Sequence, residues 1–225
     1  MGSEDRHYRR KAKQARDLKR KQAQRAPYDK VLVVCEGKKT EPNYFRELRD
    51  FYRLNSANIE ISGDCGSAPI NVVERAKELY RIEQRKGIPF DRVYCVFDKD
   101  AHYSYQPALQ VVKDAKPKGV FFAINSVPCF EYWLILHFCY TEKPFCGTVR
   151  AKSAGDQVLD DLKKYIEDYA KGNHGYFERL IAGLPQAIQY SKRTLASASA
   201  NGTDNPTTLV HELVEYLQGL SHSNK

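Results

Sequence analysis

A chain of 225 residues with a net charge of +8 is long enough for one sizeable domain and a small appendage. It has no apolar run near the roughly 20 residues of a membrane span, and its N-terminus lacks the apolar core of a secretory signal. These features exclude membrane-spanning and secreted proteins and predict a cytoplasmic protein.

The positive charge is concentrated at the N-terminus. Residues 1–27 hold 10 of the 36 Lys and Arg residues and three of the 28 acids, so the rest of the chain has 26 bases, 25 acids and a net charge of +1. The segment has almost no large apolar residues and cannot bury a core. We interpret it as a flexible arm that binds nucleic-acid phosphates, through Arg9, Arg10, Lys11, Arg16 and Arg20. The alternative is a solubilising or partner-docking tail.

The globular body begins after Ala26-Pro27 with the run Val31-Leu-Val-Val-Cys35. A short Val-rich run bounded by Glu36-Gly37 predicts a strand buried on both faces, as in a parallel sheet. Thr40 is the expected N-cap of the following helix, with Pro42 in its first turn.

Alternating strand and helix patterns continue over residues 28–146. They predict a strand at 59–61, a helix at 70–85, a strand at 93–97, a helix at 107–115 and a strand at 120–124. This order predicts an α/β fold with a mostly parallel, doubly wound sheet flanked by helices. A buried helix over residues 130–138 follows, with Glu131 in its first turn. His137 in this helix is expected to be a core residue rather than a ligand.

Residues 147–225 are predicted to form a helical C-terminal region packed on this core. One amphipathic helix runs from Val158 and ends near Gly172, and another starts near Phe177 and is broken or kinked at Pro185. Residues 194–205 are rich in Ser, Ala and Asn and predict a loop. Pro206 is expected to open the last helix.

The six cysteines include no Cys-x-x-Cys pair, and Cys35, Cys95 and Cys139 lie in apolar runs. This pattern favours buried, reduced thiols over a zinc site or a disulfide framework.

Acidic residues follow two of the predicted strands. Glu36 ends the first, and Asp98-Lys99-Asp100 ends the strand at 93–97. Residues i and i+2 of an extended segment point the same way, so Asp98 and Asp100 are expected to converge on one cation. Carboxylate oxygens without Cys or His suit Mg²⁺ or Mn²⁺. Such an ion can polarise a phosphodiester, and Glu36 would complete its ligand shell or act as a general base.

The two acidic strand ends resemble the Toprim domain of topoisomerases, bacterial primases and OLD-type nucleases. More narrowly, the chain is similar to the RloB-like family. The similar stretches are Val34-Cys-Glu-Gly-Lys-Lys-Thr-Glu-Pro-Asn-Tyr-Phe45, Val96-Phe-Asp-Lys-Asp100, the segment 125–138, the basic leader and Asn205-Pro-Thr-Thr208.

The resemblance implies a metal-dependent Toprim nuclease that acts in prokaryotic anti-phage (abortive infection) defence, with an ABC-type ATPase partner. It also implies catalytic and metal-binding roles for Glu36, Asp98 and Asp100, with Glu131 as an additional catalytic acid. We expect Lys38 and Lys39, beside Glu36, to contact nucleic acid, which is DNA or RNA. The further Asp that many Toprim domains use for a second ion is not evident, and His102 stands nearby instead.

Two other readings stay open. In one, the Toprim-like site binds nucleic acid or a nucleotide without cutting it, as a sensor module. In the other, the acids are structural turn residues of a signalling α/β domain.

Overall fold

A computed structural model describes residues 10–17, 28–66, 68–99, 102–147 and 152–222. Its centre is a five-stranded sheet in the order β2-β1-β3-β4-β5. The first four strands are parallel, and β5 pairs antiparallel with β4. The strands are β1 (Val31–Cys35), β2 (Ile59–Ser62), β3 (Arg92–Asp98), β4 (Phe121–Val127) and β5 (Thr207–Thr208). The predicted mostly parallel α/β sheet is confirmed.

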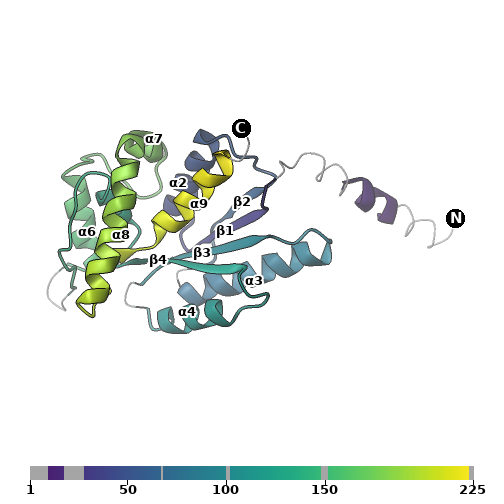
Figure 1. Cartoon of the computed structure of the whole chain (residues 1–225), viewed down its shortest axis with the longest axis horizontal. Helices are drawn as coiled ribbons and strands as arrows, with labels where there is room; N and C mark the ends of the chain where they lie inside the picture. Colours follow the sequence, from purple (N-terminus) through teal and green to yellow (C-terminus); the bar gives the residue numbers. More distant parts are fainter. Residues whose placement is uncertain (1–9, 18–27, 67, 100–101, 148–151, 223–225) are drawn as a thin grey trace.

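Helices cover both faces of the sheet, and the others gather beyond β4 (Figure 1). Helices α3 (Pro69–Arg85) and α4 (Tyr105–Asp114) lie on one face, and α2 (Thr40–Phe51) and α9 (Val210–His222) lie on the other. The remaining helices are α5 (Glu131–Ile135), α6 (Ala154–Lys163), α7 (Tyr176–Leu180), the 3-10 helix η1 (Ile181–Gly183) and α8 (Leu184–Ala200).

Strand β1 is buried on both faces, as its Val-rich sequence predicts. Alternate side chains point to opposite faces of a strand. Val31, Val33 and Cys35 therefore join the core beneath α2 and α9, while Leu32 and Val34 join the smaller core beneath α3 and α4.

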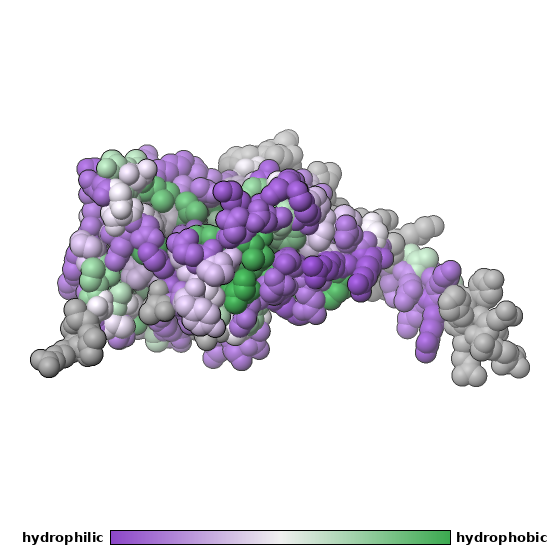
Figure 2. Space-filling view, turned by 90° about the horizontal axis from the view of Figure 1, so that it is seen from below, coloured by the Kyte–Doolittle hydropathy of each residue, from purple (hydrophilic) through white to green (hydrophobic). Residues whose placement is uncertain are grey.

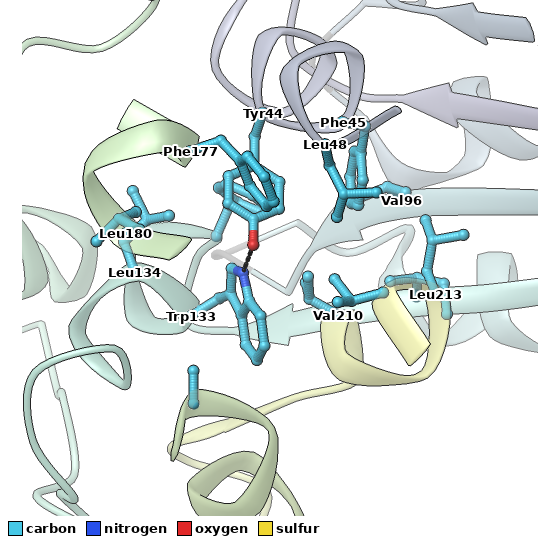
Figure 3. Close-up of a cluster of buried hydrophobic side chains, with 14 of the residues drawn as sticks. Tyr44, Phe45, Leu48, Val96, Trp133, Leu134, Phe177, Leu180, Val210 and Leu213 are labelled. Carbon is cyan, nitrogen blue, oxygen red and sulfur yellow. Dashed lines mark hydrogen bonds between the residues drawn. The ribbon is translucent and has the colours of Figure 1, made fainter. Parts of the chain in front are cut away.

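The larger core ties α2 to α5 through one polar contact among aromatic rings. The indole N–H of Trp133 donates to the hydroxyl oxygen of Tyr44 at 2.8 Å (Figure 3). Both side chains are buried, and a buried indole N–H without a partner would be destabilising by about 1–3 kcal/mol. This contact fixes the position of α5 and hence of Glu131, its first residue.

Helix α6 ends at Lys163, so the prediction of a helix reaching Gly172 is wrong. Residues 164–175 are irregular. Ile166 and Tyr169 are buried as the apolar pattern suggests, but they reach the core from non-helical backbone. Gly172 has φ of 84°, which a helix cannot accommodate. Contacts of this segment with α2 outweigh its helical pattern.

The predicted loop at 194–205 is wrong over residues 194–200, because α8 continues to Ala200, and residues 201–205 are non-helical as predicted. Thr194 and Ala198 are buried on this helix. Their small side chains allow α8 to lie close to its neighbours, so the absence of large apolar residues was a misleading signal. Pro206 does not open a helix. Thr207 and Thr208 instead pair with β4, and α9 begins at Val210.

Residues 10–17 are helical and exposed. The proposed division at residues 27 and 146 stays a prediction.

Candidate active site at the carboxyl edge of the sheet

Strands β1 and β3 lie side by side where the strand order reverses. The chain passes from β1 to β2 on one side and then returns to β3 on the other. In open α/β sheets, the crevice outside the carboxyl ends of the strands at such a reversal is the usual ligand site. Glu36 directly follows β1, and Asp98 is the last residue of β3.

Glu36 and Asp98 are direct neighbours across this junction. The backbone N–H of Glu36 donates to the carbonyl of Val96 at 3.0 Å, which extends the pairing of β1 with β3 by one residue. The Glu36 carboxylate then accepts from the backbone N–H of Asp98 at 3.2 Å. His102 follows in the loop, with Nε2 4.0 Å from Glu36 Oε1. Asp100 lies outside the described residues.

Glu41 is a buried carboxylate that the sequence reasoning missed. It lies in the first turn of α2 and is 8% exposed. A Cβ atom on Gly37 would lie 2.4 Å from Glu41 Oε2, so glycine at 37 allows the carboxylate to approach the loop after β1. The available signal was an acid in a first turn directly after the Glu36-Gly37 strand end.

The predicted N-cap of α2 is wrong. Lys39 occupies the N-cap position, and no side chain caps the helix there. Thr40 is the first helical residue, and its hydroxyl accepts from the backbone N–H of Gly172 at 3.0 Å. The Thr40 side chain is therefore used to hold a distant segment rather than its own helix.

Glu131 enters the site from α5. It is 2% exposed, and its Oε1 accepts a hydrogen bond from the Tyr169 hydroxyl at 3.1 Å. The ammonium of Lys171 lies 3.2 Å from the same oxygen. A buried carboxylate requires such partners. The sequence located this acid in a buried first turn, but it did not identify Tyr169 or Lys171.

Lys171 belongs to a segment, residues 170–177, that we call the strap. Side chains at helical spacing on α2 hold it. Thr40 accepts from the Gly172 N–H, as described above. Asn43 Nδ2 donates to the carbonyl of Gly172 at 3.0 Å. The two oxygens of Glu47 accept from the backbone N–H groups of Gly175 at 2.7 Å and Phe177 at 3.0 Å. The strap thus forms one wall of the site because α2 binds its backbone.

These elements enclose a pocket of about 400 Å³. Acids and lysines line it together, and the lining residues are Gly37, Lys38, Lys39, Thr40, Glu41, Asp98, Glu131, Lys171 and Gly172. Lys38 also pairs with Asp64 at 2.7 Å, with both side chains exposed. The two lysines predicted to contact nucleic acid therefore lie at the mouth of the acidic pocket.

The carboxylates of the pocket repel one another. Burial raises the pKa of Asp98 well above its usual value, and the charges of Glu41, Glu131 and Glu36 raise it further. Burial is also the main cause that raises the pKa of Glu41 to about 7, with Glu131 and Glu36 adding to it and Lys171 opposing it. The pocket therefore favours binding of protons or cations.

The pocket offers oxygen donors rather than sulfur. The nearby thiols of Cys129 and Cys35 stay protonated, because burial raises both pKa values. Glu131 and Asp98 add to the shift of Cys129, and Glu41 adds to that of Cys35. Such a donor set suits a hard divalent cation. Within the described residues, however, no three His, Cys, Asp or Glu side chains are arranged as a metal site.

The other predicted residues are placed as follows. Arg10, Lys11 and Arg16 are exposed on the helix at 10–17, whereas Arg9 and Arg20 lie outside the described residues. His137 is a core residue, with Nδ1 bonded to the carbonyl of Trp133 at 3.0 Å.

The six cysteines are all free. Cys35, Cys95 and Cys129 are buried, whereas Cys146 is exposed. In the described part of the chain, every helix is too short or too polar to cross a membrane.

Comparison with known proteins identifies the family. No curated protein and no solved structure matches the chain. The family model described as RloB-like protein matches residues 31–217, which contain every described acid and lysine of the pocket. Since this match covers most of the chain, the protein belongs to the RloB-like family.

Proposed function

We propose that this protein is a Mg²⁺- or Mn²⁺-dependent nuclease that hydrolyses phosphodiester bonds of DNA or RNA. The observation that carries the proposal is the convergence of Glu41, Asp98 and Glu131 on one pocket, with the Glu36 carboxylate bonded to the Asp98 backbone beside them. Burial and mutual repulsion raise the pKa values of Asp98 and Glu41. Carboxylates gathered in this way are stable together when a cation or protons compensate their charge.

Glu36 and Asp98 would hold the divalent ion, together with Asp100, which follows Asp98 by two residues in the sequence. A bound divalent cation would neutralise these acids and polarise a phosphodiester. The oxygen-only donor set supports this choice of ion.

The chain's own residues have distinct roles in this proposal. The Asp98 backbone N–H orients the Glu36 carboxylate. Glu41, with a pKa of about 7, can take up or release a proton near neutrality and is the best-suited general acid or base. Lys171, Lys38 and Lys39 on the pocket wall supply positive charge for the phosphates of a strand. Tyr169 and Lys171 position Glu131.

The wider biological role belongs to the same proposal. Membership of the RloB-like family supports action in anti-phage defence, in the cytoplasm and with an ABC-type ATPase partner. The basic residues of the N-terminal arm would increase the affinity for nucleic acid without taking part in the chemistry.

Cleavage assays with the purified full-length protein test the proposal. Plasmid DNA, single-stranded DNA and tRNA are incubated with the protein and MnCl₂ or MgCl₂, with and without the ATPase. We expect cleavage that stops with EDTA and is lost in Asp98→Asn. Lys192→Gln, which changes an exposed lysine paired with Glu215, is the control and should cut like the wild type. If the protein cuts none of these substrates under any of these conditions, the proposal is excluded.

A binding or sensor module is the second candidate. The observation that favours it is the ion pair of Lys171 with Glu131, which already compensates one acid of the pocket. In that case, the wild type and Asp98→Asn would both bind nucleic acid without cutting it.

A further inference from the structure

A second pocket lies at the opposite edge of the sheet. It has a volume of about 460 Å³, and its lining residues are Lys77, Tyr80, Arg81 and Gln84 of α3 together with Ala115, Lys116, Pro117 and Phe121. Phe121 pairs with Val93 at the start of β3, whereas Asp98 ends that strand. Five residues of strand separate these positions, or roughly 16 Å. This pocket is therefore separate from the acidic one.

The charged side chains that line this second pocket are all cationic. Lys77 is partly compensated, because its ammonium lies 2.9 Å from Glu74. Arg81 and Lys116 have no ion-pair partner among the described residues, and both are exposed. Two uncompensated cations at one concave site attract an anionic ligand.

Two aromatic rings line the same pocket. The rings of Tyr80 and Phe121 meet edge to face, with centroids 5.3 Å apart. They are 6% and 9% exposed, so the rings present a rigid apolar floor rather than free faces. Gln84 adds an amide that can both donate and accept hydrogen bonds. The face that carries α3 and α4 is otherwise mostly hydrophilic, with a narrow hydrophobic strip (Figure 2).

We propose that this second pocket binds a nucleotide through its phosphates. Arg81 and Lys116 contact the phosphate oxygens, and the floor and Gln84 contact the sugar or the base. The volume is in the range of small-ligand sites, and arginine matches the geometry of a phosphate. The nucleotide is either free or part of a strand, since both carry the same phosphoester group. This binding does not depend on the proposed nuclease activity.

Calorimetric titration in EDTA tests the proposal with three probes: ATP, inorganic pyrophosphate and a ten-residue oligothymidylate. EDTA removes the divalent ion through which the acidic pocket would bind phosphates, so binding that remains in EDTA does not depend on that ion. We expect saturable binding of ATP or of the oligonucleotide, with a Kd that rises at least about tenfold in the double variant Arg81→Gln/Lys116→Gln. Binding of ATP alone indicates a free nucleotide, and binding of the oligonucleotide alone indicates a strand.

A matched control removes the same charge elsewhere. Lys152→Gln/Lys192→Gln changes two exposed lysines that pair with Asp160 and Glu215, and it should bind like the wild type. The proposal is overturned if neither ATP nor the oligonucleotide binds saturably, even where pyrophosphate binds, or if the control loses as much affinity as the pocket variant. It is equally overturned if Asp98→Asn weakens binding while Arg81→Gln/Lys116→Gln does not. Circular dichroism confirms that each variant is folded.

Discussion

The carboxylate of Glu36 accepts a hydrogen bond from the backbone N–H of Asp98 at 3.2 Å. This contact joins the ends of β1 and β3, so the two strand-end acids share one rigid junction. A side chain that is held by backbone is pre-oriented, which a catalytic or metal-binding carboxylate requires. Substitutions of Glu36 can therefore separate the effect of its negative charge from its role as the acceptor of the Asp98 N–H.

Glu36→Gln should abolish nuclease activity without unfolding the protein. Glutamine keeps an oxygen that can accept from the Asp98 N–H, but it removes the negative charge. We expect cleavage to fall by about 100-fold or more, while the melting temperature stays within a few degrees of the wild type. Glu36→Ala removes the acceptor as well and should also lower the melting temperature. A Glu36→Gln variant that cleaves normally would exclude Glu36 from the chemistry.

Glu41→Gln should stabilise the protein when divalent ions are absent. The folded-state pKa of Glu41 is about 7, above its usual 4.5. Because the folded state binds this proton more tightly, the group's contribution to stability is lost as pH rises from about 4.5 to about 7. At pH 8 the neutral amide avoids this loss, so the free energy of unfolding should rise by about 3 kcal/mol.

Urea unfolding in EDTA at pH 4 and pH 8 measures this effect. The advantage of Glu41→Gln should be present at pH 8 and absent at pH 4. Adding MgCl₂ should then raise the melting temperature of the wild type more than that of the variant, because a ligand stabilises the state that binds it. If the variant is no more stable than the wild type at pH 8, burial and the neighbouring charges do not disfavour the ionised Glu41 carboxylate in the folded protein.

The sequence identified the acids that follow strands, because both strands have clear apolar patterns and their carboxyl ends must meet at one sheet edge. Glu36 and Asp98 were placed in this way. Glu41 was missed because its burial depends on Gly37, which permits a close approach that no periodicity reveals.

The sequence also did not predict the pocket wall formed around Lys171, and the reason is different from that for Glu41. Lys171 and Tyr169 lie in a segment with a helical apolar pattern, and its non-helical path is set by distant contacts with α2. Such contacts join residues about 130 positions apart. Local propensity cannot encode them, and the same limitation explains the incorrect loop at the end of α8.

Glu47→Gln should loosen the strap and impair the acidic pocket indirectly. Glu47 accepts two backbone N–H groups at the start of α7, so it acts as a remote helix cap. Loss of a cap typically lowers stability by about 0.5–2 kcal/mol. We expect faster hydrogen exchange in residues 170–177 and a lower cleavage rate, since Lys171 is carried by this segment. Glu178→Gln, an exposed acid of α7, should change neither. If hydrogen exchange in residues 170–177 is the same in Glu47→Gln as in the wild type, Thr40 and Asn43 are sufficient to hold the strap.

His137 should make the folded protein sensitive to acid. Burial lowers the pKa of His137 from 6.5 to about 4, while hydrogen bonds with the backbone of Trp133 and Leu134 oppose the shift. The ring lies between Trp133 and Tyr44, which are uncharged. The unfolded chain therefore takes up a proton below pH 6.5 that the folded chain accepts only near pH 4. The free energy of unfolding should fall by about 3 kcal/mol over this range.

The His137→Asn variant isolates this contribution. Asparagine can still donate to the carbonyl of Trp133, so the variant should fold, although with lower stability at neutral pH. Its free energy of unfolding should depend less steeply on pH between 4 and 6.5 than that of the wild type, because the titrating ring is gone. Ile135→Val in the same buried helix is the control and should lower stability by about 1 kcal/mol at every pH. The quantity to measure is the difference in free energy of unfolding between His137→Asn and the wild type. The wild-type value alone is not sufficient, because Glu41 titrates in the same pH range and changes the stability in the opposite direction. If this difference does not change with pH, His137 is already charged in the folded protein.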